Sequence, residues 1–201
     1  SKLDVSDKSS ISSFLQPALK QDSSIDVLIN NAGINNNDRE TPDLAAQVID
    51  VNYRGTLQMC QTFLKEAKMA QNPGSRIVNV SSTACQLSNY APAVQDKFRA
   101  AKSIADVDAL ADTYVSAVQR GGNAQAEGGW GSGPRSYQVS KALINASTVV
   151  LAKQNPDVLI NCCCPGWVDT DMGHQIGRPP KTRGRRACAA PCAARASRVG
   201  C

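Results

Sequence analysis

The chain has 201 residues, enough for one domain with a sizeable core, and its formal net charge is +5 at pH 7. All 17 acidic residues lie at or before Asp171, whereas six basic residues lie in 181–201, so residues 1–180 hold 16 basic and 17 acidic side chains, a net charge of −1. The basic balance belongs to the C-terminal segment and gives no reason to expect nucleic-acid binding by the rest of the chain.

The first part of the chain predicts two helices separated by a strand. DKSSISSFLQPALKQ (7–21) places apolar residues on one helical stripe, although Pro17 is unfavourable inside a helix. SIDVLINNAG (24–33) is rich in Val and Ile and ends in small and polar residues, which is typical of a buried strand. The long pattern of 42–71 predicts a helix, and Pro42 suits its first turn.

The second part continues the alternation. SRIVNVSS (75–82) and DVLINCCCPG (157–166) predict two more buried strands, and SYQVSKALINASTVVLAKQ (136–154) predicts a helix between them. Residues 83–135 contain a helical stretch and a glycine-rich sequence, and we interpret them as an insertion of one or two helices followed by a mobile loop.

Strands that alternate with helices predict a parallel α/β sheet. In such sheets the ligand lies beyond the carboxyl ends of the strands. Asn30–Gly33, Ser81–Ser82 and Pro165–Gly166 each follow a predicted strand, so we expect them to converge at that edge.

Eight cysteines would suggest a disulfide framework in a small secreted protein, but the context argues against one. The sequence shows no signal peptide and no uninterrupted apolar span long enough for a membrane helix. Cys162, Cys163 and Cys164 are consecutive within a predicted strand. We interpret them as reduced, mostly buried thiols and expect a cytoplasmic protein.

Residues 179–201 break the pattern, because beyond Thr182 only Val199 is a branched or aromatic apolar residue. We expect this Arg/Ala/Cys-rich tail to be disordered. Cys188 and Cys192 have no His or second Cys pair beside them to complete a zinc site, so no metal is expected. The tail also lacks aromatic residues and an amphipathic stripe, which argues against nucleic-acid and membrane partners.

The sequence SYQVSK at 136–141 places Tyr137 four residues before Lys141. On a helix the two side chains would share a face. A cation beside a phenol favours the phenolate and lowers its pKa, so the pair is suited to general acid/base catalysis. The same spacing also occurs where an aromatic ring packs under a solvated lysine, so the pair alone does not decide between catalysis and packing.

Five motifs, in order, resemble the short-chain dehydrogenase/reductase family: NNAG at 30–33, VNYRG at 51–55, VNVSS at 78–82, YQVSK at 137–141 and PGWVDTDM at 165–172. The resemblance covers residues 1–178. It implies an incomplete dinucleotide-binding domain of the α/β class, with a partial Rossmann-like, doubly wound parallel sheet.

The 55-residue separation of Ser82 and Tyr137 is long for this family and resembles the monomeric carbonyl reductases. In those proteins an inserted helical segment covers the surface that other members use to oligomerise. The resemblance therefore implies a monomer, if the chain folds, that reduces ketones, aldehydes or quinones to alcohols with NADPH.

The resemblance also implies catalytic roles. Tyr137 would donate a proton to the developing alkoxide, and Lys141 would lower the phenol pKa and hold the nicotinamide ribose. Ser82, rather than the adjacent Ser81, would hydrogen-bond the carbonyl oxygen. Asn52 would hold a water that links Lys141 to solvent; the alternative is a helix-interior asparagine that bonds locally.

Cofactor contacts are implied for three segments, one near the adenine, one along the adenosine ribose and one at the nicotinamide. Small residues in the second segment would allow close approach. NADPH follows from the subgroup alone, and NAD remains an alternative. The residues implied, in that order, are Asp4 and Val5; Asn30, Ala32 and Gly33; and Pro165, Gly166, Val168 and Thr170.

The sequence departs from the family pattern at both ends. The family begins with a strand and a glycine-rich turn that holds the cofactor pyrophosphate, whereas this sequence reaches LDVSD at once. By that plan the N-terminal βαβα part is lacking, and after GRPPK (177–181) a tail from a frameshift or mis-spliced exon replaces a helix and a strand. The hypotheses are therefore a fragment of an active reductase and an inactive fragment that cannot hold the pyrophosphate.

Overall fold

The computed structural model describes residues 2–21, 24–35, 39–166, 168 and 170–174. Its sheet has three parallel strands in the order β1 (Val27–Asn30), β2 (Arg76–Val80) and β3 (Leu159–Cys163). In the register, Leu28 pairs with Ile77, and Ile77 pairs with Ile160. The predicted strands, and with them the parallel α/β fold, are confirmed.

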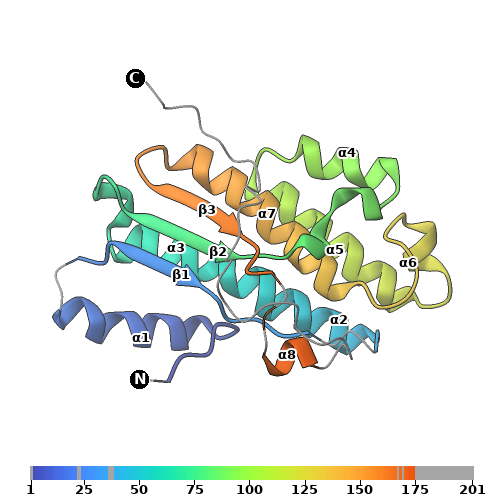
Figure 1. Cartoon of the computed structure of the whole chain (residues 1–201), viewed down its shortest axis with the longest axis horizontal. Coiled ribbons are helices and arrows are strands. Elements are labelled where there is room, and N and C mark those ends of the chain that lie inside the picture. Colours follow the sequence, from blue (N-terminus) through green and yellow to red (C-terminus); the bar gives the residue numbers. More distant parts are fainter. Residues whose placement is uncertain (1, 22–23, 36–38, 167, 169, 175–201) are drawn as a thin grey trace.

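Helices connect the strands and pack behind the sheet in Figure 1, where α3 and α7 cross the face away from the viewer. The α-helices are α1 (Lys8–Gln21), α2 (Pro42–Val48), α3 (Thr56–Glu66), α4 (Pro92–Ala100), α5 (Ile104–Arg120), α6 (Ala124–Glu127), α7 (Ser136–Gln154) and α8 (Asp171–His174). A π-helix, η1 (Ile49–Gly55), joins α2 to α3, and the 3-10 turns are η2 (Met69–Gln71), η3 (Thr83–Cys85) and η4 (Leu87–Asn89).

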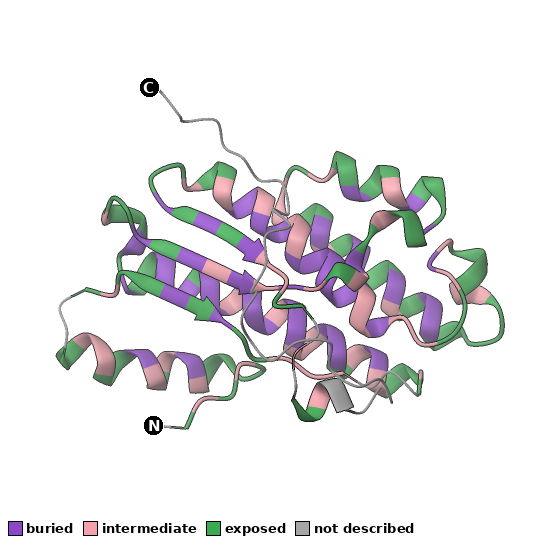
Figure 2. Cartoon of the chain, viewed as in Figure 1, coloured by how far each residue is buried: buried purple, intermediate pink, exposed green. Residues whose placement is uncertain are grey.

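The two faces of the sheet differ, as Figure 2 shows by the alternation of buried and exposed positions along each strand. Leu28, Ile77 and Ile160 are buried against the helices in the hydrophobic core. On the opposite face Val27 is 52% exposed, Ile29 is 63% exposed and Leu159 is 50% exposed. Within the described residues the sheet is therefore covered on one face, as a partial doubly wound fold requires.

The predicted helix over 7–21 is confirmed as α1, with Pro17 inside it. A proline cannot donate to the carbonyl four residues earlier, which belongs to Ser13. Ser13 is exposed, so water can bond that carbonyl.

The predicted helix over 42–71 begins at Pro42 as expected, but it is not α-helical throughout and it ends earlier than predicted. The π-helix η1 interrupts it, α3 ends at Glu66, and Lys68 adopts a left-handed conformation with φ of 54°. Single π-helical turns inside α-helices often occur at functional sites. Here the π-helical turn contains Asn52, whose side-chain contacts are described below.

The insertion holds α4, α5 and the short α6, one helix more than predicted. The glycine-rich sequence after α6 is anchored by Trp130, which is 1% exposed. Its indole packs edge-on against Tyr90, Phe98 and Tyr114, with ring centroids 5.4–6.2 Å away. This aromatic cluster fixes the glycine-rich sequence against α4 and α5.

The cysteine prediction holds in part. Cys162 is buried, but Cys163 and Cys164 are half-buried. The predictions for the tail at 179–201, including Cys188 and Cys192, lie outside the described residues. In the part of the chain that is described, no helix has the length and apolar composition needed to span a bilayer.

Candidate active site

A cavity of about 850 Å³ lies at the carboxyl ends of the three strands, toward which the arrows of Figure 1 point. Its walls come from the segments that follow β1, β2 and β3, and from α7 and α8. The lining residues are Asn31, Ala32, Gly33, Asn35, Val80, Ser81, Ser82, Ala84, Tyr137, Gln138, Lys141, Pro165, Gly166, Val168, Thr170 and Met172.

Tyr137 and Lys141 lie one helical turn apart near the start of α7, as predicted from their spacing. The Lys141 Nζ is 5.6 Å from the centroid of the Tyr137 ring and donates a 2.8 Å hydrogen bond to the Val80 carbonyl oxygen. Lys141 is only 4% exposed. The ammonium is therefore held against the end of β2 and the phenol, rather than solvated.

Burial shifts the pKa values of both groups. It lowers the pKa of Lys141 to about 8, although charge on Cys85 and Cys164 acts in the opposite direction. Burial also raises the pKa of Tyr137, partly offset by a side-chain hydrogen bond from Ser82. The net direction at Tyr137 is opposite to the lowering expected from a neighbouring lysine, because loss of solvent raises the pKa by more than the Ser82 hydrogen bond lowers it.

The two serines after β2 point differently. The Ser82 side chain hydrogen-bonds Tyr137 and accepts from the Ala84 amide at 3.1 Å as the N-cap of η3. Ser81 is 2% exposed, and its hydroxyl donates to the Lys141 carbonyl oxygen at 3.3 Å. Ser82 is therefore the serine whose hydroxyl lies beside the phenol.

Asn52 is fully buried in the π-helical turn and joins three segments. Its Oδ1 accepts from the Ile34 amide at 2.8 Å, and its Nδ2 donates to the Ile34 carbonyl at 2.9 Å and to Ser140 Oγ at 3.0 Å. These partners are distant in sequence, so the alternative of purely local bonding is wrong. Its predicted link to a water stays a prediction.

Gly33 lies where Asn52 and Lys141 approach the backbone. A Cβ at this position would be 3.2 Å from Asn52 Oδ1 and 3.6 Å from Lys141 Nζ. Any side chain would therefore crowd the polar end of the cavity.

The structure brings most of the predicted cofactor residues to this cavity, namely Ala32, Gly33, Pro165, Gly166, Val168 and Thr170. It does not bring the Asn30 side chain there. Asn30 is buried on the helix-covered face, where its Nδ2 donates to Asn79 Oδ1 at 2.8 Å. Strand alternation explains the difference, because Leu28 and Asn30 point into the core and the next residue, Asn31, lines the cavity.

Asp4 and Val5 do not line this cavity either. Val5 lines a separate cavity of about 640 Å³ between residues 5–8 and the α2–α3 segment, and its carbonyl would lie 2.7 Å from a Cβ at Gly55. The Asp4 carboxylate accepts from the backbone and hydroxyl of Ser6. Asp4 and Val5, which were predicted to contact the adenine, therefore lie apart from the residues that line the first cavity.

Sequence reasoning missed several lining residues, among them Asn31, Asn35, Gln138 and Met172. Alternation along β1 was a usable signal for Asn31. Gln138 directly follows Tyr137 and carried no signal of its own.

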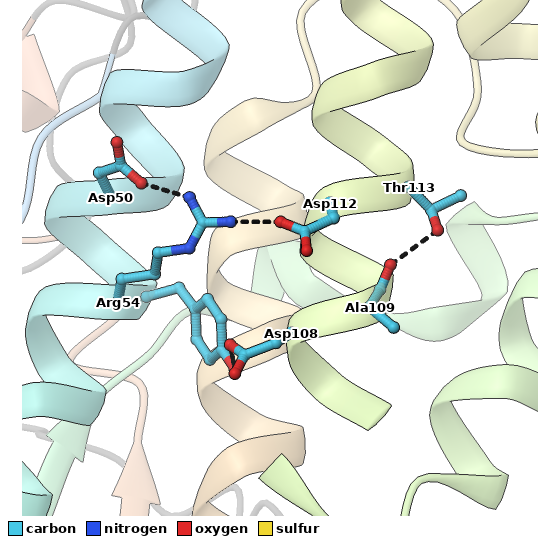
Figure 3. A network of polar contacts seen from close by, with 7 residues as sticks. Asp50, Arg54, Asp108, Ala109, Asp112 and Thr113 are labelled. Atoms are coloured by element: carbon cyan, nitrogen blue, oxygen red, sulfur yellow. Dashed lines mark hydrogen bonds and ion pairs between the residues drawn. The ribbon is translucent and has the colours of Figure 1, made fainter. Parts of the chain in front are cut away.

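A polar network holds the π-helical turn against α5. Figure 3 shows Arg54 between Asp50 and Asp112, with both N–O distances at 2.5 Å. In the same network Tyr53 Oη donates to Asp108 Oδ1 at 2.8 Å. Because Tyr53 directly follows Asn52, the insertion braces the segment that positions Asn52.

Comparisons with known proteins agree with this geometry. A family model described as short chain dehydrogenase matches residues 1–106. The chain is 32% identical to (+)-neomenthol dehydrogenase of Arabidopsis thaliana, with 88% of this chain and 66% of the relative covered. It is 34% identical to carbonyl reductase (NADPH) 1 of Mus musculus, with 85% and 63% covered. The chain thus spans just under two thirds of the length of these relatives.

Among solved structures, salutaridine reductase from Papaver somniferum superposes with a TM-score of 0.77 at 25% identity. The match covers 87% of this chain and 70% of that one. The fold and the sequence comparisons therefore point to the same group of proteins.

Proposed function

Because the chain belongs to the short-chain dehydrogenase family, we propose that it carries the acid/base site of an NADPH-dependent reductase that converts ketone, aldehyde or quinone carbonyls to alcohols. The observation that carries the proposal is the cluster of Tyr137, Lys141 and Ser82 in one cavity at the carboxyl ends of the strands. The names of the carbonyl reductase relatives support the substrate class and the cofactor.

Carbonyl reduction needs a proton for the developing alkoxide. Burial raises the Tyr137 pKa and so keeps the phenol protonated at neutral pH, as a proton donor requires. Ser82, beside the phenol, is placed to hydrogen-bond the same oxygen as charge develops on it. Donors of this kind contribute about 2.7–4 kcal/mol to transition-state stabilisation.

Lys141 supplies positive charge beside the Tyr137 phenol. Its pKa of about 8 leaves it mostly protonated at pH 7, yet able to exchange its proton near that pH. Asn52 holds Ile34 and Ser140 in place around the lysine. A proton path from Asn52 to solvent is part of this proposal.

The residues present fit a nicotinamide cofactor. The absence of a Cβ at Gly33, beside a buried ammonium, leaves a polar recess suited to ribose hydroxyls. When bound, the cofactor would supply the hydride. Residues that would hold it are Ala32, Gly33, Lys141, Pro165, Gly166, Val168 and Thr170.

NADPH is the proposed form, with NAD as the alternative. A monomeric state, a cytoplasmic location and a small-molecule carbonyl substrate as the one partner also belong to the proposal. They rest on the resemblance to monomeric carbonyl reductases.

The first experiment is a thermal melt of the 201-residue chain with and without NADPH. A ligand at about 100 times its dissociation constant adds about 2.7 kcal/mol to the stability of a folded binder. A cooperative transition that rises with NADPH is expected. A chain with no cooperative transition or no shift would be an inactive fragment that cannot hold the cofactor.

The second experiment measures NADPH oxidation with a simple quinone. Tyr137→Phe should abolish turnover because the proton donor is removed. The matched control is Tyr90→Phe, since the Tyr90 hydroxyl is buried with no hydrogen-bond partner in the described structure. Turnover that persists in Tyr137→Phe would refute the mechanism.

A further inference from the structure

Glu40 lies two residues before the first residue of α2, and its carboxylate accepts hydrogen bonds from α5 and from the start of α7. Its Oε1 accepts from the Tyr114 hydroxyl on α5 and from Ser136 Oγ at 2.5 Å. Its Oε2 accepts from the backbone amides of Arg135 at 3.1 Å and Ser136 at 3.4 Å. Glu40 is half-buried, whereas Tyr114 is fully buried.

These bonds replace the missing cap of α7. The first amides of a helix have no partner within the helix, and the side chain of the N-cap residue Arg135 makes no hydrogen bond to them. A carboxylate is also favourable at a helix N-terminus, because the helix dipole is positive there. Glu40 lies 96 positions before Ser136 in the sequence. It thus provides the hydrogen-bond acceptor that a residue next to the helix usually provides.

The position matters because Tyr137 directly follows Ser136. The segment that precedes Glu40 in the sequence is also held to α7, because Asn52 hydrogen-bonds both the Ile34 backbone and the Ser140 side chain. The wall of the cavity that contains Gly33 is therefore linked to α7 through Ile34, and the start of α2 is linked to it through Glu40.

We propose that Glu40 is a positioning residue that fixes the first turn of α7 and so holds Tyr137 at its working position in the cavity. The inference rests on the proposed function, because it assigns Tyr137 a role in the reaction. Glu40 itself does not line the cavity, so it acts through Ser136 and the backbone.

Glu40→Gln is the informative change. The amide keeps the size of the side chain but replaces one acceptor oxygen by a donor group, which faces either the two hydroxyls or the two backbone amides. The hydroxyls can accept as well as donate, so the NH2 group can face them while the amide oxygen keeps the two backbone amides. In that orientation the negative charge is lost, and hydrogen bonds to a neutral acceptor are about half as strong. In the other orientation the bonds to the Arg135 and Ser136 amides are lost. The matched control is Glu66→Gln, which changes an exposed glutamate at the end of α3.

The first test is amide hydrogen exchange by NMR on the chain without ligand. Weakening or loss of the cap should speed exchange of the Arg135 and Ser136 amides by about fivefold to tenfold, while amides from Lys141 to Leu151 stay unchanged. The control should match the unsubstituted chain. Unchanged exchange at Arg135 and Ser136 in Glu40→Gln would overturn the proposal.

The second test is steady-state reduction of a quinone. Because misplacement of a catalytic group by about 1 Å can cost about 100-fold, kcat should fall by about tenfold or more in Glu40→Gln. The KM for NADPH should change by less than about twofold, since Lys141 lies a full turn further along α7. An unchanged kcat in an otherwise active protein would overturn the proposal.

The two tests separate the inference from the proposed function. If the unsubstituted chain turns over no NADPH, the proposed function fails, and hydrogen exchange alone decides whether Glu40 holds the helix start. If Glu40→Gln shows no cooperative melt, Ser136→Ala takes its place. This change removes one of the bonds to Glu40 and should speed exchange of the amides at positions 135 and 136 by a smaller factor. No change would again overturn the proposal.

Discussion

Lys141 shows how burial changes the chemistry of a single residue. An ammonium that is 4% exposed loses most of its hydration, and one hydrogen bond to Val80 replaces it only in part. Its pKa therefore falls from 10.5 to about 8. The lysine stays mostly protonated at neutral pH, and the raised pKa of the neighbouring Tyr137 phenol has the same first cause, loss of solvent on burial.

The shift at Lys141 predicts a pH dependence of stability. Between pH 8 and 10.5 the unfolded chain binds a proton at this lysine and the folded chain does not, so its contribution to the unfolding free energy rises with pH. The other titrating groups contribute equally to the unfolding free energies of the unsubstituted chain and of Lys141→Met, so their contributions cancel in the comparison. The difference in unfolding free energy between the unsubstituted chain and this variant should rise by about 2 kcal/mol from pH 7.5 to 9.5.

Urea unfolding at the two pH values measures this difference. The control is Lys153→Met, which changes an exposed lysine on the same helix and should show no comparable dependence. A difference for Lys141→Met that is flat across this range would mean that the folded-state pKa is not lowered.

Elements were predictable where the pattern was strong. The three strands and α7 followed from apolar runs and their bounding residues, and α7 has the bounds predicted from 136–154. The cavity followed from the rule for parallel sheets, which brought Gly33, Ser82 and Gly166 to one edge of the sheet, whereas Tyr137 was linked to them through the family resemblance.

The π-helix could not be predicted from residues 42–71, because a π-helical turn leaves the apolar periodicity almost unchanged. It depends on contacts with distant segments, such as Asn52 with Ile34 and Tyr53 with Asp108. The role of Glu40 was invisible for the same reason, since its partners lie on α5 and α7. The direction of Asn30 was readable from strand alternation, but the motif outweighed it.

The polar network that joins η1 to α5 predicts that two substitutions lower the unfolding free energy by unequal amounts. Tyr53 is fully buried and donates to a charged acceptor, so Tyr53→Phe should lower the unfolding free energy by about 1–2 kcal/mol. The Asp112 side chain is 66% exposed, so Asp112→Ala should cost less than about 1 kcal/mol. Urea unfolding at low and high salt checks this, because only the Asp112 effect should shrink with salt. If both substitutions lower the unfolding free energy equally, the exposed ion pair of Arg54 and Asp112 stabilises the contact between η1 and α5 as much as the buried Tyr53 hydroxyl does.

At the scale of the whole molecule, one face of the sheet carries apolar side chains that none of the described helices covers. Val27, Ile29 and Leu159 are half or more exposed on this face. Val27 and Ile29 are two positions apart on β1, and Arg76 of β2 lies between Val27 and Leu159 in the register. Contiguous exposed apolar residues favour association. The opposite face, with Leu28 and Ile77, is packed against helices.

Neighbouring residues on β1 therefore provide a matched pair. Ile29→Thr changes a side chain that is 63% exposed, so it should alter the unfolding free energy by less than about 0.5 kcal/mol and reduce self-association. Leu28→Thr changes a side chain that is 6% exposed, so it should cost about 2–5 kcal/mol through lost burial and an unpaired hydroxyl. Urea unfolding measures the first quantity, and sedimentation velocity over a range of concentrations measures the second. If the two substitutions destabilise the chain equally, the face containing Ile29 is covered in solution; if they differ as expected and association persists in Ile29→Thr, the contacts between molecules form elsewhere.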